Sequence, residues 1–342
     1  MGEEQKAITL VEAVTQALAH ELARDPQVVV FGQDVGANGG VFRATDGLQA
    51  RFGAERVLDT PLAENMIAGI AVGMATQGLK PIAEFQFMGF IYPALDHILN
   101  HAARLRNRTR GRLSCPVVYR APYGGGIHAP EHHSESTEAL FAHIPGLRVV
   151  VPSSPARAYG LLLAAIRDPD PVLFLEPKRI YRAAKQRVPD NGEALPLDCA
   201  FVLREGTDIT LIAWGASLKE TLAAAEQLST EGIEAEVIDP ATLKPLDIHS
   251  ILDSVEKTRR CVVVHEAARY AGLGAEIAAQ IQEYAFDLLD APVQRVTGYD
   301  TVMPYYQLEQ VYLPGADRIL AAAKSCLGYH RETPPQKARG AE

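Results

Sequence analysis

The sequence predicts an α/β protein of two domains, each built on a mostly parallel sheet. Three observations support this prediction. The chain has 342 residues, which at roughly 150 residues per domain allows about two domains. Short apolar runs alternate with amphipathic helical patterns in both halves. Between the halves, residues 177–198 lose this pattern and carry charge, prolines and Asn191-Gly192, as a linker does.

The elements of the first half follow from local patterns. Thr9-Leu10-Val11-Glu12 has the spacing of a capping box, in which a hydroxyl and a carboxylate satisfy free helix donors, and it predicts a helix to about Arg24. Val28-Val29-Val30-Phe31-Gly32 then predicts a short buried strand. The same alternation predicts strands near residues 81–85, 116–120, 147–151 and 172–175, and helices near 64–78, 94–108 and 155–167.

The second half repeats this alternation. It predicts strands at residues 209–214, 233–238, 261–265 and 293–296, and helices at 218–230, 248–257 and 275–289. We expect the polar tail, residues 331–342, to fray.

Composition excludes several classes of protein. With 47% hydrophobic and 22% charged residues, the chain is unlike disordered, collagenous or disulfide-stapled proteins. A net charge of −9 without a basic block argues against nucleic-acid and anionic-membrane partners. The four cysteines are far apart without a CxxC pair, which fits a reducing compartment and gives no zinc spacing.

The apolar stretches are too short to span a bilayer, which needs roughly 20 residues. The first residues show neither a signal-peptide nor a transit-peptide pattern. We therefore expect a cytoplasmic protein, or one of the mitochondrial matrix if a leader was removed.

Phosphate-binding signatures are incomplete. Gly124-Gly125-Gly126 lacks the Lys-Ser/Thr of a P-loop, and Gly272-Leu273-Gly274 lacks the third glycine of a dinucleotide fingerprint, so both are interpreted as turns. The chain also lacks Gly-Asp-Gly followed about thirty residues later by Asn, the pattern with which thiamine diphosphate enzymes hold magnesium and diphosphate.

Glu64 begins a predicted helix that is studded with small residues, as in a core or a subunit interface. A carboxylate in the first helical turn is favoured by the helix dipole, so Glu64 fits a purely structural role. The alternative is a desolvated carboxylate with a raised pKa, suited to share a proton with a cofactor nitrogen.

Residues 128–135 hold three histidines and two acids beside the glycine-rich turn. Pro130 breaks the helix that an i, i+4 metal-ligand pair would use, and neither HExxH nor a thiolate is present, which argues against zinc. An active-site loop with proton donors near neutral pH is the preferred interpretation, and a solvated loop is the alternative.

Residues 85–92 are rich in aromatic side chains and follow the carboxyl end of a predicted strand, where α/β folds bind ligands. These rings could stack a planar group. By spacing alone, packing in the core explains most of them equally well.

Several motifs together resemble the β subunit of thiamine-dependent 2-oxoacid dehydrogenases. The likeness extends from about Ile8 to Leu327 and is closest to the branched-chain 2-oxoacid type, with pyruvate and acetoin members as near neighbours. The motifs that carry it are Asp59-Thr60-Pro61-Leu62-Ala63-Glu64, Glu84-Phe85-Gln86-Phe87, Tyr92-Pro93-Ala94-Leu95-Asp96, His133-Ser134, His143-Ile144-Pro145-Gly146-Leu147, Glu176-Pro177-Lys178-Arg179-Ile180-Tyr181-Arg182, Gly215, His265-Glu266-Ala267 and Gly298-Tyr299-Asp300-Thr301.

The resemblance implies a transketolase-like pyrimidine-binding domain at residues 1–182, a linker at 183–200, a transketolase C-terminal-like domain at 201–335 and a tail at 336–342. It also implies an α2β2 heterotetramer in which thiamine diphosphate is shared with the α subunit, and in which that subunit holds the magnesium. This agrees with the missing Gly-Asp-Gly pattern. A lipoyl acyltransferase core would be the further partner.

The resemblance also assigns roles to single residues. Glu64 matches the glutamate that hydrogen-bonds the aminopyrimidine ring, and His133 matches a histidine near the substrate that serves acyl transfer to lipoyl-lysine. Further cofactor contacts are implied for Leu62, Ala63, Gln86 and Phe90, and substrate contacts for Phe87, Met88, Gly89, Phe90 and His133.

Three positions depart from the usual pattern of the family. Gln33 replaces a glutamate, Gly89-Phe90 replaces Asp-Tyr, and Glu135 replaces a glutamine, which leaves the substrate preference open. Some relatives hold potassium through backbone carbonyls, so the resemblance also implies a potassium site. The matching positions are Cys115, Val117, Val118, Ala165, Asp168 and Asp170.

The sequence therefore predicts the β chain of a 2-oxoacid dehydrogenase that decarboxylates branched-chain 2-oxoacids and reductively acylates a lipoyl group. A pyruvate or acetoin dehydrogenase β chain is the alternative enzyme. A scaffold subunit without catalytic residues is the alternative of another class.

Overall fold

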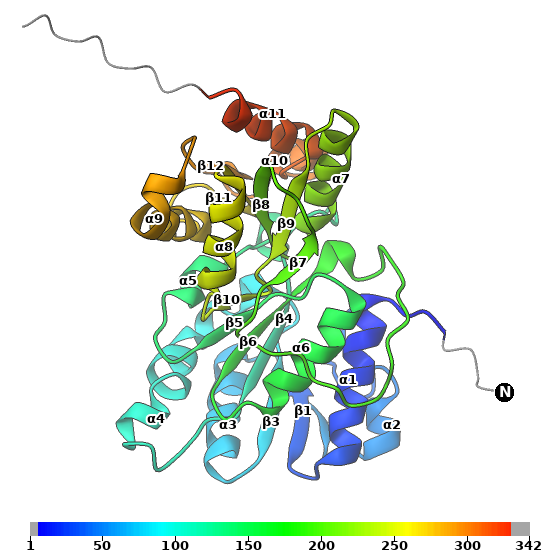
Figure 1. Cartoon of the computed structure of the whole chain (residues 1–342). Helices are drawn as coiled ribbons and strands as arrows, with labels where there is room; N and C mark the ends of the chain where they lie inside the picture. Colours follow the sequence, from blue (N-terminus) through cyan, green and yellow to red (C-terminus); the bar gives the residue numbers. More distant parts are fainter. Residues whose placement is uncertain (1–5, 330–342) are drawn as a thin grey trace, which may run out of the picture.

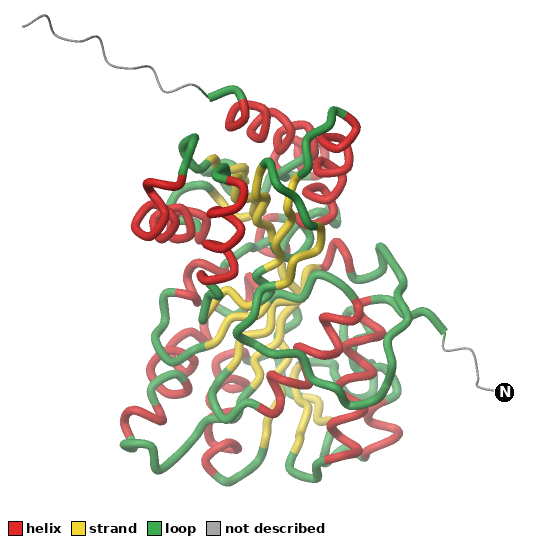
Figure 2. The backbone as a smooth tube through the Cα atoms, viewed as in Figure 1, coloured by secondary structure: helices red, strands yellow, loops and turns green. Residues whose placement is uncertain are grey.

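The computed structural model describes residues 6–329 and contains two sheets, one in each half of the chain (Figure 1). The first sheet lies in the lower part of Figure 1, and the second lies above it. Helices cover both faces of each sheet, as Figure 2 shows. This confirms the predicted α/β class with two sheets.

Six strands of the seven-stranded first sheet run parallel, and β10, contributed by the second half of the chain, pairs antiparallel with β5. The sheet is thus completed across the domain boundary. In chain order its strands are β1 (Val28–Gly32), β2 (Val57–Asp59), β3 (Lys80–Glu84), β4 (Val118–Tyr123), β5 (Arg148–Val150), β6 (Val172–Pro177) and β10 (Thr242–Lys244), and they lie side by side as β10-β5-β6-β4-β3-β1-β2.

Strand β1 is buried on both faces, which explains its continuous apolar sequence. Val28 and Val30 belong to the core shared with α1 and α6, whereas Val29 and Phe31 belong to the core shared with α3. The helices of this half are α1 (Leu10–Arg24), α2 (Leu48–Phe52), α3 (Glu64–Thr76), α4 (Leu105–Arg108), α5 (Glu138–Ala142) and α6 (Pro155–Arg167).

The second sheet has five strands, of which the edge strand β7 is antiparallel to β9. Its strands are β7 (Phe201–Arg204), β8 (Ile209–Ala213), β9 (Ala235–Asp239), β11 (Cys261–Ala268) and β12 (Gln294–Gly298), in the order β12-β11-β8-β9-β7. Its helices are α7 (Ser217–Thr230), α8 (Ile248–Thr258), α9 (Leu273–Ala285), α10 (Tyr306–Tyr312) and α11 (Ala316–Leu327).

One apolar core crosses from the first sheet to the second. Val149 and Val151 of the first half belong to the same cluster as Trp214, Ile251 and Ile277 of the second half. A continuous core resists separation of the two halves, because parting them would expose apolar surface to water. Contacts between the domains can therefore position groups of a site.

The structure corrects several predicted elements. The helix predicted at 94–108 is broken into the 3-10 turn η2 (Tyr92–Ala94), the π-helix η3 (His97–Ala102) and α4. The strands β2, β7 and β10 were not predicted; each has three or four residues, and none is apolar over its whole length. Helices α2, α5, α10 and α11 were also not predicted.

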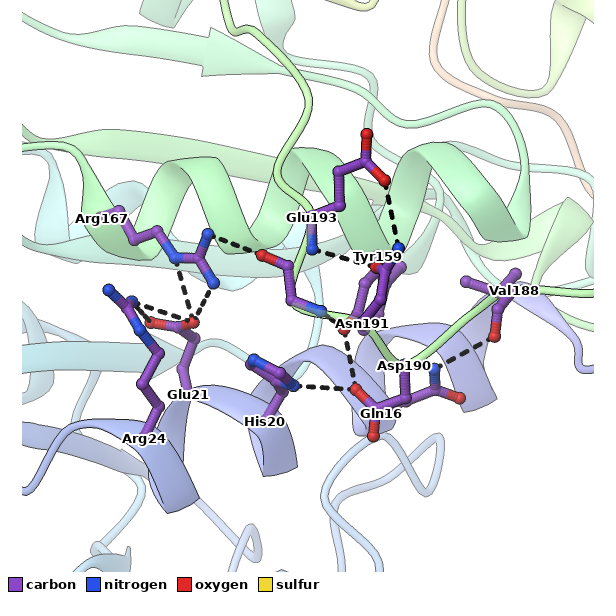
Figure 3. A network of polar contacts seen from close by, with 11 residues as sticks. Gln16, His20, Glu21, Arg24, Tyr159, Arg167, Val188, Asp190, Asn191 and Glu193 are labelled. Atoms are coloured by element: carbon purple, nitrogen blue, oxygen red, sulfur yellow. Dashed lines mark hydrogen bonds and ion pairs between the residues drawn. The ribbon is translucent and has the colours of Figure 1, made fainter.

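The segment predicted as a linker is packed rather than free. Its end crosses α1 and α6, where His20 Nδ1 lies 2.9 Å from an Asp190 oxygen and the Tyr159 hydroxyl donates to Asp190 at 2.8 Å (Figure 3). Arg167 donates to the carbonyl of Gly192 at 2.9 Å in the same network (Figure 3). The tails predicted at 331–342 and 336–342 lie outside the described residues.

Within residues 6–329, no helix combines the length and the apolar character that a membrane span requires.

Candidate functional site

The candidate site lies where neighbouring parallel strands of the first sheet end. Strands β2, β1, β3 and β4 are adjacent and parallel, so the segments that leave their carboxyl ends meet at one edge. Glu64 follows β2, Asp34 follows β1, Gln86 follows β3, and the histidines follow β4. Ligands of α/β folds bind at this edge.

Asp59 and Gln86 hold the segment after β1 at this edge. The carboxylate of Asp59 accepts hydrogen bonds from the backbone N–H of Gly36 at 2.6 Å and of Ala37 at 3.1 Å. Gln86 donates from Nε2 to Asp34 Oδ2 at 3.0 Å. Gln86, predicted to contact the cofactor, therefore also joins two of the segments that form the edge.

Glu64 is the first residue of α3, where the helix dipole favours a negative charge. It is half-buried, as is Ala63, and the side chain of Leu62 is 68% exposed. The chain alone thus does not enclose Glu64 as the desolvation hypothesis requires. Any further enclosure has to come from a partner or a ligand.

His133 lies among aromatic rings. Its ring centroid is 4.3 Å from that of Phe87 and 5.2 Å from that of Phe90, both in edge-to-face orientation. Burial, with the neighbouring His132 as the next cause, lowers the pKa of His133 below its usual value. The ring is therefore favoured in its neutral form at neutral pH, in which one nitrogen can accept a proton and the other donates a hydrogen bond.

The Nδ1 atom of His133 is buried and, within residues 6–329, has no hydrogen-bond partner. Buried polar atoms nearly always have partners, so an exception calls for a specific explanation. A ligand that supplies the missing contact is such an explanation.

Gly89 allows the histidine-bearing segment to approach this ring cluster. A Cβ atom at Gly89 would lie only 2.0 Å from the backbone oxygen of His132 and 3.1 Å from the side chain of Glu135. Glu135 also faces Tyr92, and this contact adds to burial in raising the pKa of the Tyr92 hydroxyl. Two of the three departures from the family pattern, Gly89 and Glu135, thus meet here.

The sequence prediction grouped Met88 with these residues, but Met88 is fully buried in the core. Its side chain is therefore closed off from solvent, and it does not line an open site in this chain.

The argument against zinc concerned the histidines of residues 128–135, which lie in the histidine loop, residues 124–136. In the described part of the chain, a group of three donors that all lie within 4.8 Å of one another is formed by Asp96, His97 and His101. They lie on and beside η3, not in this loop.

The two segments predicted to hold potassium are adjacent. Cys115 donates its N–H to the carbonyl of Pro169 at 3.0 Å, and the carbonyl of Val117 accepts from Val172 at 2.9 Å. Ala165 lies in the last turn of α6, where the residue four positions later is Pro169, which has no N–H to donate to its carbonyl. The carbonyl of Ala165 thus lacks a helical donor, whereas those of Cys115 and Val117 already accept hydrogen bonds, and the potassium site stays a prediction.

Sequence reasoning missed a buried ion cluster in the centre of the sheet. Arg120 donates to both carboxylate oxygens of Glu176 at 2.7 and 2.8 Å, and it also donates to Glu84. Burial raises the pKa of Glu84 although Arg120 opposes the shift. The signal that could have revealed this cluster is a charged residue within each of three buried strands: Glu84 in β3, Arg120 in β4 and Glu176 in β6.

Comparison with known proteins agrees with this architecture. Residues 6–184 match the family "Transketolase, pyrimidine binding domain", and residues 199–319 match "Transketolase, C-terminal domain". A solved structure described as "Split gene transketolase, inactive beta4 tetramer" has a TM-score of 0.76 and 26% identity, covering 94% of this chain and 99% of the other. The fold is thus of the transketolase class.

Two relatives define the family more narrowly. The pyruvate dehydrogenase E1 component subunit beta of Bacillus subtilis is 49% identical over 322 residues, which are 94% of this chain and 99% of the relative. The same subunit of Acholeplasma laidlawii is 51% identical over 314 residues, covering 92% and 96%. The chain belongs to the family of E1 β subunits of 2-oxoacid dehydrogenases.

Proposed function

We propose that the chain is the catalytic β subunit of a pyruvate dehydrogenase, which shares thiamine diphosphate with an α subunit in an α2β2 assembly. The observation that carries the proposal is His133, a half-buried histidine with an unpartnered Nδ1 atom between two aromatic rings. It lies at the sheet edge that Glu64 also reaches. A scaffold without catalytic residues would have no need of such a histidine.

The substrate is proposed from the relatives. Both of the relatives described above are named for pyruvate, whereas the branched-chain prediction was based on the segment Glu176–Arg182. In the structure, this segment makes contacts that hold the fold: Lys178 donates to the carbonyl of Gly124, and Arg179 pairs with Glu220 at 2.6 Å. It therefore says little about the side chain of the substrate, and pyruvate replaces a branched-chain 2-oxoacid as the proposal.

The residues at the edge fit half of a thiamine diphosphate site. The exposed side chain of Leu62 and the ring of Phe90 offer apolar surface to a planar ring, and Glu64 offers a carboxylate at a helix start. Because Glu64 remains open to solvent on one side, a second subunit would complete the site. We assign the magnesium to that subunit, and potassium to the carbonyls around Cys115 and Ala165.

When bound, thiamine diphosphate supplies a carbanion nucleophile and an electron sink for decarboxylation. Glu64 would hold a proton at a ring nitrogen of the cofactor. A general acid or base must lie within hydrogen-bond reach of the atom with which it exchanges the proton. The lowered pKa of His133 favours the neutral ring, which would donate a hydrogen bond to the substrate carboxylate through its N–H, or take up a proton and pass it on as the acyl group moves to a lipoyl-lysine.

The test measures the two half-reactions of a His133→Ala variant assembled with the α subunit. Decarboxylation of pyruvate is followed with an artificial electron acceptor, and reductive acylation is followed with a lipoyl domain. We expect acyl transfer to fall by roughly 100-fold or more, and more than decarboxylation. His249→Ala is the matched control, because it removes an exposed histidine on α8 of the second domain.

If neither half-reaction falls, His133 is part of a solvated loop and the catalytic proposal fails. If assembly persists while no 2-oxoacid is turned over by the unmodified protein, the scaffold alternative is favoured.

A further inference from the structure

The histidine loop, residues 124–136, has an unusual backbone. It leaves β4 through three successive glycines, of which Gly124 and Gly126 have φ of +81° and +83°, and His128 has φ of +61°. Its regular structure is a single 3-10 turn, η4 (Glu131–His133). Non-glycine residues rarely adopt positive φ, so the surroundings must hold His128 in this conformation.

Glu309 of α10 supplies this constraint from the second domain. Its Oε1 atom accepts hydrogen bonds from the N–H of Gly126 at 2.9 Å and of His128 at 3.2 Å. Its Oε2 atom lies 2.8 Å from Nδ1 of His128. The carboxylate is 1% exposed, so its hydrogen bonds to the two backbone N–H groups are shielded from competing water on the Glu309 side.

A second carboxylate holds the start of the same loop. Glu266, near the carboxyl end of β11 in the second sheet, accepts from the N–H of Gly125 and from the Ser136 hydroxyl at 3.0 Å. The loop is therefore held near both ends by Glu266 and in its left-handed section by Glu309. A buried lysine, Lys178, donates to the carbonyl of Gly124 and balances part of this negative charge.

The glycines are required for this approach. A Cβ atom on Gly124 would lie 2.6 Å from Glu266 Oε1, and one on Gly126 would lie 2.2 Å from the side chain of Arg179. Gly124-Gly125-Gly126 thus form a turn, as predicted. This turn presents successive backbone N–H groups to carboxylates rather than to phosphate.

We propose that Glu309 is a positioning residue: it holds the left-handed section of the histidine loop from the second domain, so that the loop places His133 against Phe87 and Phe90. The inference rests on the proposed function in one respect: it takes His133 as a residue of the catalytic site, whose position therefore matters. The contacts of Glu309 with the loop do not depend on which 2-oxoacid is used.

The experiment compares Glu309→Ala, Glu309→Asp and Glu309→Gln in the full chain assembled with the α subunit. Amide hydrogen exchange of residues 125–133 reports on the loop itself, and the KM for thiamine diphosphate and kcat for lipoyl acylation report on the site. Glu231→Ala is the control, because it removes an exposed carboxylate that pairs with Lys324 in the same domain.

In Glu309→Ala, we expect exchange at Gly126 and His128 to be at least about tenfold faster, because two bonds to a charged acceptor are lost. We expect kcat for acylation to fall by about tenfold or more, with the KM for the cofactor unchanged. Glu309→Gln should restore much of both, because its amide oxygen can still accept from the same N–H groups. Glu231→Ala should behave as the unmodified protein.

Unchanged exchange in Glu309→Ala would overturn the proposal, as would faster exchange with unchanged acylation, or a Glu309→Gln variant no better than Glu309→Ala. If Glu309→Ala does not fold, Glu309→Asp replaces it, since the shorter side chain withdraws the acceptor while keeping the charge. If the unmodified assembly turns over no 2-oxoacid, the proposed function fails, and hydrogen exchange still decides whether Glu309 holds the loop.

Discussion

Adding a single methyl group at Gly89 should displace the histidine loop. In the structure, a Cβ atom at this position would lie 2.0 Å from the His132 backbone oxygen, and ordinary contacts begin at 3.4 Å. Backbone cannot swing away as the end of a flexible side chain can. The loop must therefore retreat by about 1.4 Å in Gly89→Ala, and His133, the next residue, must move with it.

The size of the effect follows from this displacement. Misplacing a reacting group by about 1 Å can lower a rate by about 100-fold. Overpacking typically costs about 1–3 kcal/mol of stability, and we expect a value near the lower limit because the glycine-rich loop can yield. The variant should thus remain folded and assembled while reductive acylation of the lipoyl domain falls by about 100-fold.

The assay is reductive acylation by the assembled protein, with thermal unfolding as the measure of the fold. Gly315→Ala is the matched control, because a Cβ atom there meets nothing within 4 Å. Acylation by Gly89→Ala within about threefold of the unmodified rate would refute the reasoning. It would mean that the loop can retreat without disturbing His133.

Three further predictions concern Glu64, Gly73 and Glu138. Glu64→Gln should keep the fold and the assembly but lose decarboxylation by roughly 100- to 10,000-fold, because an amide cannot exchange the proton; a rate within a few-fold of normal would reduce Glu64 to a helix-stabilising acid. Gly73 lies on the exposed side of α3, and a Cβ atom there meets nothing within 4 Å. Gly73→Leu should therefore leave the isolated chain stable but weaken assembly with the α subunit, measured by sedimentation. Unchanged assembly would mean that this side of α3 is not an interface. Burial raises the pKa of the Glu138 carboxyl to about 7, so its contribution to folding stability is present at low pH and is lost as the pH rises through about 7. From pH 5 to pH 8, urea unfolding should therefore show a smaller loss of stability in Glu138→Gln than in the unmodified protein. An equal loss in the two proteins would contradict the assignment.

The small residues of α3 differ in what surrounds them. The sequence pattern predicted a core or a subunit interface for the helix as a whole. Gly69, however, already faces its own chain, since a Cβ there would lie 3.1 Å from the ring of His97. Gly73 has no such neighbour within the described chain, so a substitution there reports on a partner.

The alternation of elements could be predicted from the sequence because buried parallel strands are apolar on both faces, as in β1. The family motifs also pointed to the edge where Glu64, Gln86 and the histidines leave adjacent strands. Pattern and resemblance together therefore predicted a candidate site at residue level, and the structure shows which of its segments lie at one edge of the sheet.

Long-range pairing between the domains could not be predicted. Glu309 and Glu266 lie far along the chain from the loop that they hold, and neither carries a local pattern that would mark a buried acceptor. The same holds for β10, which joins the first sheet from the second half. Such contacts depend on how two domains pack, which periodicity within one segment does not encode.

The most direct test of the shared site is calorimetric titration of thiamine diphosphate with magnesium into the chain alone and into the chain assembled with its α subunit. We predict weak binding to the chain alone, because it lacks Gly-Asp-Gly and leaves Glu64 half-exposed, and saturable binding to the assembly. Tight, magnesium-dependent binding to the chain alone would contradict the account.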